Sequence, residues 1–108
     1  MKGIFLVLVF SLFSTSGYAW DGYVTGKITT VDVAGGANYA FRVTLEGAPT
    51  LCNSNHTWAY INTSNSNYQT YVAVLLAAKM SGSTVTIYSN QEQSSGNGYC
   101  RIGYISLR

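Results

Sequence analysis

Residues 23–33 read YVTGKITTVDV, and this stretch decides the fold. β-Branched residues dominate it and polar residues alternate with apolar ones, which is the pattern of a strand with one buried face. Gly26 interrupts the pattern and indicates a bulge or bend. We therefore predict one long, bent strand at the start of the domain.

The residues that follow extend this strand into a sheet. Residues 34–38, AGGAN, have the composition of a turn, and residues 39–45 alternate between apolar and polar side chains. This alternation predicts a second strand that forms a hairpin with the first. Gly47 and Pro49 end it, and a short third strand is expected at residues 58–61.

One segment has the periodicity of an α-helix. Its apolar residues fall at i, i+3, i+4, i+7, i+8 and i+12, and they are Tyr68, Tyr71, Val72, Leu75, Leu76 and Met80. Ser64, Asn65 and Ser66 are candidate N-terminal caps, and Gly82 is a C-terminal stop. The pattern predicts a helix that buries this stripe.

Two further strands complete the domain. They are expected at residues 84–89 and 99–107, with a loop rich in Gly, Ser and Asn at 91–98. The element order is then β-β-β-α-β-β. A mainly β fold with one helix in this order, starting with a long bulged strand, is typical of a five-stranded Greek-key barrel, the OB-fold. An α+β sheet with the helix across one face is the alternative.

The first residues have the features of a secretory signal peptide. Lys2 precedes an apolar run at residues 4–13, and small residues follow at Gly17 and Ala19. The apolar run is too short to cross a membrane, which takes roughly 20 residues. We therefore expect a signal peptide at 1–19 and a single secreted or periplasmic domain at 20–108, with no membrane anchor.

The chain contains two cysteines, Cys52 and Cys100. In an oxidising compartment, an even pair in so small a domain predicts one disulfide, which stabilises it by restricting the unfolded chain. A metal site is a poor alternative because His56 is the only histidine.

The sparse charge excludes some functions. The net charge is +2 and the basic residues are scattered, whereas nucleic-acid binding needs clustered Lys and Arg. No nucleophile, base and acid stand together in the sequence, and His56 reads as a solvated loop residue. We expect no catalytic residues, no metal and no cofactor.

The aromatic residues are the candidates for binding. Nine tyrosines and two tryptophans occur in 108 residues, and rings with a polar atom are favoured at glycan and protein interfaces. Tyrosine is also favoured within strands, so many of them have a structural role. The residues assigned to the core are Tyr39, Trp58, Tyr68 and Tyr71. Tyr23 and Tyr88 are less constrained, and Tyr60 shares a strand face with Trp58.

Several short motifs carry a resemblance to a known group of proteins. They are Tyr39-x-Phe41-Arg42-Val43, Leu51-Cys52, Trp58-Ala59-Tyr60, Ser66-Asn67-Tyr68, Val85-Thr86-x-Tyr88 and Gly98-Tyr99-Cys100-x-Ile102-Gly103-Tyr104. The pattern resembles small uncharacterised secreted proteins of Gram-negative bacteria, and it covers nearly all of residues 20–108.

A fainter resemblance rests on Trp20, on Tyr23-Val24-Thr25-Gly26, on the spacing of Cys52 and Trp58, and on Ser81-Gly82-Ser83-Thr84-Val85-Thr86-Ile87-Tyr88. These features resemble the receptor-binding B subunits of the subtilase-cytotoxin and pertussis-like toxins. The resemblance implies a disulfide-bonded OB-fold, a pentameric ring and binding of sialylated glycans. Thr25 would then bond the sugar acid, with Tyr23 or Tyr88 beside it. The chain departs from that family at Ser89, in its number of cysteines and in residues 101–108.

The sequence thus predicts a secreted, non-enzymatic binding module that presents Tyr23, Thr25, Tyr60 and Tyr88 to a glycan or glycoprotein. By resemblance, it would be a homo-oligomeric B-type toxin subunit. The alternative is a periplasmic or secreted factor that binds another protein, such as an enzyme inhibitor or an accessory protein of the cell envelope. A small hydrolase is a distant third.

Overall fold

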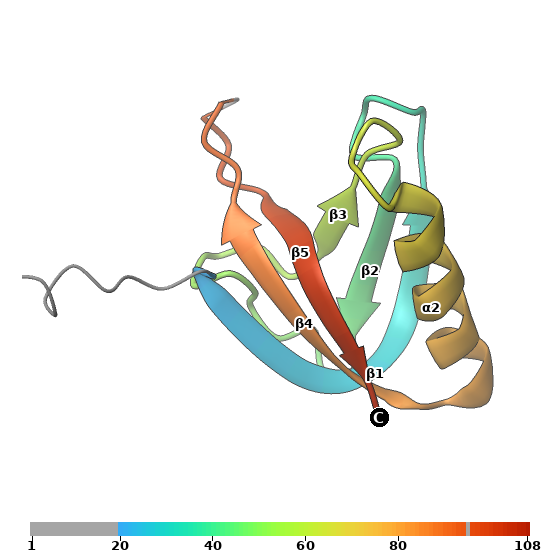
Figure 1. Ribbon diagram of the computed structural model, residues 1–108. Coiled ribbons are helices and arrows are strands. Elements are labelled where there is room, and N and C mark those ends of the chain that lie inside the picture. Colours follow the sequence, from blue (N-terminus) through green and yellow to red (C-terminus); the bar gives the residue numbers. More distant parts are fainter. Residues whose placement is uncertain (1–19, 95) are drawn as a thin grey trace, which may run out of the picture.

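The structure, a computed structural model, describes residues 20–94 and 96–108 (Figure 1). The elements are β1 (Gly22–Val33), β2 (Phe41–Leu45), β3 (Ala59–Ile61), α2 (Tyr68–Ser81), β4 (Thr84–Gln91) and β5 (Cys100–Leu107). The predicted class, mainly β with one helix and five strands, is confirmed. The predicted signal peptide at 1–19 lies outside the described residues.

The strand pairings form a closed barrel in the order β1-β2-β3-β5-β4. All pairs are antiparallel except β3 with β5. The first part of β1 pairs with β4 and its second part pairs with β2, so this strand belongs to both sides of the barrel. Figure 1 shows β1 curving beneath the other strands, from blue to cyan. One long strand thereby connects two groups of shorter ones.

The irregularity in β1 lies at Thr29, so of the bulge or bend predicted at Gly26 the bulge is wrong. Gly26 pairs in regular register with Val85. The partners of β1 step from Ile28 opposite Leu45 to Thr30 opposite Thr44, which leaves Thr29 as the extra residue. An extra residue increases the local twist of a strand, here just after β1 changes its partner.

The helix begins and ends close to its predicted limits, but its N-terminal cap differs. Asn67 precedes the first turn in a left-handed conformation, with a φ of 61°, and makes no side-chain cap hydrogen bond. None of the predicted caps Ser64, Asn65 and Ser66 occupies this position. At the other end, Gly82 has a φ of 68° and donates its N–H to the carbonyl of Ala78, as its role of stop predicts.

The helix buries only part of the predicted stripe, because Tyr68, Tyr71, Val72 and Leu75 pack in or against the core and the other two residues do not. Leu75 and Ala78 are fully buried, whereas Leu76 is 40% exposed and Met80 is 86% exposed. The prediction for these last two side chains was wrong. Because α2 is apolar on most of its circumference, periodicity could not select the face that packs against β1 and β5.

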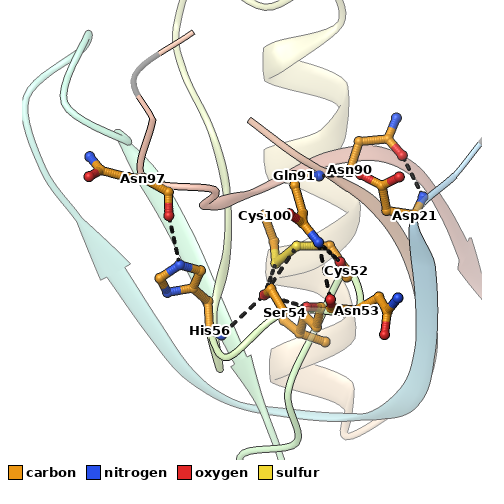
Figure 2. The surroundings of a disulfide bond; sticks show 10 residues. Asp21, Cys52, Asn53, Ser54, His56, Asn90, Gln91, Asn97 and Cys100 are labelled. Atoms are coloured by element: carbon orange, nitrogen blue, oxygen red, sulfur yellow. Dashed lines mark hydrogen bonds between the residues drawn. A yellow bond between two sulfur atoms is a disulfide. The ribbon is translucent and has the colours of Figure 1, made fainter. Parts of the chain in front are cut away.

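A disulfide joins Cys52, in the loop before β3, to Cys100 at the start of β5. Its Cα atoms lie 5.6 Å apart and the two residues are 48 positions apart in sequence. The predicted disulfide is therefore present. Figure 2 shows Gln91 beside it, and the Gln91 side-chain nitrogen donates to the carbonyls of Cys52 and Asn53. This end of the barrel is held by covalent and polar contacts together.

Among the described residues, no helix is both long and apolar enough to cross a membrane.

Candidate functional site

Four aromatic side chains gather on the outer surface of β1, β4 and β5. We call Trp20, Tyr23, Tyr88 and Tyr104 the aromatic platform. Tyr23 lies opposite Tyr88, and Tyr88 lies opposite Tyr104, so the three tyrosines form one row across three strands. The rings of Tyr23 and Tyr88 are stacked with centroids 5.3 Å apart, and Tyr88 meets Tyr104 edge-on at 5.0 Å.

The alternation of β4 places this row on the outer face. Val85, Ile87 and Ser89 are fully buried inside the barrel, and successive side chains of a strand point to opposite faces. Tyr88 therefore points outward. Its neighbours in the row are well exposed, Tyr23 by 67% and Tyr104 by 52%. The platform consequently offers ring faces to the solvent.

Trp20 reaches the platform because Gly103 leaves room for it. Gly103 is an extra residue in β5, since the pairing steps from Tyr88 opposite Tyr104 to Ser89 opposite Ile102. A Cβ atom on Gly103 would lie only 2.2 Å from the Trp20 ring. The indole ring therefore packs directly on the backbone, 6.2 Å from both Tyr88 and Tyr104.

Two hydrogen bonds fix the chain next to Trp20. The backbone N–H of Asp21 donates to the side-chain oxygen of Asn90, and the backbone N–H of Gln91 donates to the Asp21 carboxylate (Figure 2). The Gly103 carbonyl is also engaged, because the hydroxyl of Tyr71 on α2 donates to it at 2.8 Å. The platform is thus attached to β4 and to the helix.

A row of hydroxyls lies next to the platform. Thr25, Thr86 and Ser106 are paired across the same three strands, two residues along from the tyrosines. Two residues of a strand correspond to about 7 Å. The side-chain oxygens of Thr25 and Thr86 are 2.8 Å apart, and Thr25 is exposed whereas Thr86 is 2% exposed. We call these three residues the hydroxyl row.

Two basic residues, Lys27 and Arg108, lie two residues beyond the hydroxyl row on β1 and after β5. Lys27 pairs with Thr84, and the Thr84 carbonyl accepts the backbone N–H of Arg108. Along this surface, ring faces are therefore followed by hydroxyls and then by positive charge. Such a series can stack on an apolar face, exchange hydrogen bonds and attract an anion.

The structure separates Tyr60 from the other three predicted binding residues. Tyr60 is 2% exposed and belongs to a second aromatic cluster. The other members of this cluster are Tyr39, His56, Trp58 and Tyr99. Burial, with a contribution from the Glu92 charge, raises the pKa of Tyr60 to about 12. A side chain so enclosed packs the loops together instead of meeting a ligand.

Tyr39 and Trp58, which were predicted to lie in the core, belong to this second cluster instead and are half-buried. The ring of Tyr39 lies 4.7 Å from that of Tyr60, and the Arg42 guanidinium lies 4.9 Å above Trp58. The His56 ring packs against Tyr99, with its Nε2 atom 3.0 Å from the Asn97 carbonyl (Figure 2). His56 therefore lies in a loop, as predicted, but it is half-buried by packing rather than fully solvated.

Tyr68 and Tyr71, the remaining tyrosines assigned to the core, are partly buried against it.

Residues 20–94 and 96–108 contain no group of three His, Cys, Asp or Glu side chains that could hold a metal ion.

Sequence reasoning found Tyr23, Thr25 and Tyr88, which the structure brings onto one surface. It did not single out Trp20 or Tyr104 as candidates. The register of β5 against β4 places Tyr104 beside Tyr88, and that register shifts at Gly103. A shift of this kind leaves only a glycine as its signal in the sequence.

No protein-family model, no curated protein and no solved structure matches this chain.

Proposed function

We propose that this protein is a secreted or periplasmic, non-enzymatic module that binds glycans at the aromatic platform and the hydroxyl row. The observation that carries the proposal is the row formed by Tyr23, Tyr88 and Tyr104, with Thr25 two residues from Tyr23 on the same face of β1. Exposed rings next to hydroxyls match a sugar, which has an apolar C–H face and a rim of hydroxyl groups.

The ligand in this proposal carries a negative charge. Lys27 and Arg108 follow the hydroxyl row and provide the only basic side chains among the residues described for this surface. An acidic sugar stacked on Tyr23 would direct its carboxylate towards Thr25 and these cations. The resemblance to B subunits that bind sialylated glycans, with Thr25 in the place of their serine, supports the same class of ligand.

We further propose that the barrel is an OB-fold and that the chain assembles into a homo-oligomeric ring of B-type subunits. The closed five-strand barrel, with the helix between β3 and β4, supports the fold assignment. The exposed apolar side chains of Leu76 and Met80 on α2 support association, since such side chains are covered in obligate assemblies.

A second candidate is binding of another secreted protein, for example as an enzyme inhibitor or accessory factor. The same exposed tyrosines favour it, because Tyr and Trp are enriched where protein interfaces have their strongest contacts. The two candidates differ in what binds the purified protein.

A glycan array followed by calorimetry tests the proposal. We expect binding to sialylated glycans above background, an affinity about tenfold lower for Tyr23→Ala, and a smaller loss for Thr25→Ala. Tyr23→Phe, which keeps the ring, and Thr30→Ala, which removes an exposed threonine elsewhere on β1, should bind like the parent. If no glycan binds, or if Tyr23→Ala binds as well as the parent, the glycan proposal is wrong.

A further inference from the structure

A groove runs between α2 and β5, next to the aromatic platform. Its volume is about 420 Å³, within the range of roughly 300–1,000 Å³ that is usual for ligand pockets. The lining residues are Asn67, Thr70, Tyr71, Val74, Tyr104, Ile105 and Leu107. The groove exists because β3 pairs only with the start of β5, at Cys100 and Arg101, so that α2 rather than a strand borders the rest of β5.

Tyr104 connects the groove to the platform. Its ring packs against Trp20 and Tyr88 in the platform, and the same side chain lines the groove. Because Tyr104 is 52% exposed, a ligand that covers this ring on the platform also lies at the entrance to the groove. The two surfaces are therefore continuous.

The groove continues in turn into a more polar hollow. Asn67 and Thr70 line both, and the hollow of about 490 Å³ adds Tyr68 and Gln69 from the helix. Thr63 and Asn65 from the preceding loop complete its lining. Rings, hydroxyls and amides thus follow one another from β1 to the start of α2.

The walls of the groove are suited to a sugar ring. Tyr71 is held in place because its hydroxyl donates to the Gly103 carbonyl, and its side chain lines the groove together with Tyr104. Val74 adds apolar surface, and Thr70 and Asn67 add polar atoms at one end. Aromatic walls with a few polar groups are the usual composition of a site for an uncharged organic ligand.

We propose that the groove binds the second sugar unit of a linear oligosaccharide whose terminal unit lies on the platform. The polar hollow lined by Asn67 and Thr70 then receives the unit after it. This inference rests on the proposed function and adds to it the length and direction of the ligand. It predicts that affinity depends on glycan length and that the dependence is lost when the groove is filled.

The experiment measures the affinities of a sialylated trisaccharide and of its terminal monosaccharide, N-acetylneuraminic acid, by calorimetry. Val74→Trp fills the groove, and Lys79→Trp places the same ring on an exposed position of α2 outside it. Asn67→Gly removes an amide from the groove while keeping a residue that accepts the left-handed conformation. Thermal unfolding of each variant confirms that it is folded.

For the parent, we expect the trisaccharide to bind about tenfold more tightly than the monosaccharide. Val74→Trp should remove this advantage and leave monosaccharide binding unchanged. Lys79→Trp should keep it, and Asn67→Gly should reduce it by a factor of a few even if Val74→Trp fails to fold.

Four results would overturn the inference. If the parent binds both glycans equally, or if Val74→Trp keeps the advantage of the trisaccharide, the groove takes no sugar and the platform proposal stands alone. If the parent binds neither glycan, both the groove inference and the sialylated ligand fall together. Capture of a peptide in the groove without glycan binding would favour the protein-binding alternative and would also overturn it.

Discussion

Gly103 determines whether Trp20 can join the platform. The residue lies at an irregularity of β5, supports the indole ring through its bare Cα atom and accepts a hydrogen bond from Tyr71. Glycine is required here for close approach and not for an unusual backbone conformation, since its φ is not among the positive values of the chain. The backbone at Gly103 therefore contacts both Trp20 of the platform and Tyr71 of the helix.

Gly103→Ala should displace Trp20. The added Cβ would lie 2.2 Å from the indole ring, and such overpacking costs about 1–3 kcal/mol of unfolding free energy. Urea unfolding measures the loss, and near-ultraviolet circular dichroism reports the altered tryptophan environment. Gly35→Ala is the control, because nothing lies within 4 Å of its Cβ position. Equal stability of the two variants would show that Trp20 does not pack on Gly103.

Tyr60 should make stability depend on alkaline pH. Its folded-state pKa is about 12, against 10.0 for the unperturbed side chain, so above pH 10 the unfolded chain loses its proton first. The stabilising contribution is therefore complete below pH 10 and is lost between pH 10 and 12. The loss is on the order of 2 kcal/mol. Unfolding free energies measured against pH should show this decrease, and Tyr60→Phe should flatten it. An unchanged pH profile in Tyr60→Phe would contradict the assignment.

At the scale of the elements, β5 is held in two different ways. Its first residues pair with β3 and are bonded to the loop before it through Cys52 and Cys100. The rest of β5 pairs with β4 on one side and meets α2 on the other. The disulfide therefore closes the barrel where β3, with three residues, offers few backbone hydrogen bonds.

Removal of the disulfide should lower stability strongly. The bond closes a segment of 48 residues, for which the chain-entropy model gives about 4 kcal/mol. We expect the double variant Cys52→Ala with Cys100→Ala to unfold at a much lower urea concentration than the oxidised parent. A reducing agent should shift the parent towards the variant and leave the variant unaffected. If the reduced and oxidised parent unfold at the same urea concentration, the bond contributes little.

The elements also show where sequence patterns were sufficient. All five strands and the helix were predictable, because alternation, helical spacing and punctuating glycines such as Gly82 act locally. The bulge at Thr29 was not predictable, because its position depends on where the pairing partner of β1 changes from β4 to β2. The buried face of α2 was predicted only in part, because apolar residues on both sides of a helix leave the choice to the barrel beside it.

At the scale of the whole molecule, α2 lies outside the closed barrel and has apolar side chains exposed. Leu76 and Met80 remain exposed on the helix, whereas the five strands are paired with one another around the barrel. Figure 1 shows α2 along one side of the strands, away from the loop between β4 and β5. This side is where the proposed ring would bury further surface.

Native mass spectrometry should find an oligomer of the parent. Replacing Leu76 and Met80 by glutamate should give a monomer, because the charges would have to be buried without partners. Lys79→Glu, a charge change on the neighbouring helical position, is the control and should leave assembly intact. A parent that is monomeric at micromolar concentration would contradict the ring.

The sequence by itself determined the class of the fold, the helix limits and the disulfide, because local periodicity and a single pair of cysteines leave few alternatives. It also identified Tyr23, Thr25 and Tyr88, but it could not separate them from Tyr60. Only the tertiary structure decided that Tyr60 is buried while Tyr23 and Tyr88 join Trp20 and Tyr104 on the surface. The reason is that neighbours across a sheet are set by strand register and barrel closure, which depend on contacts between residues far apart in the chain.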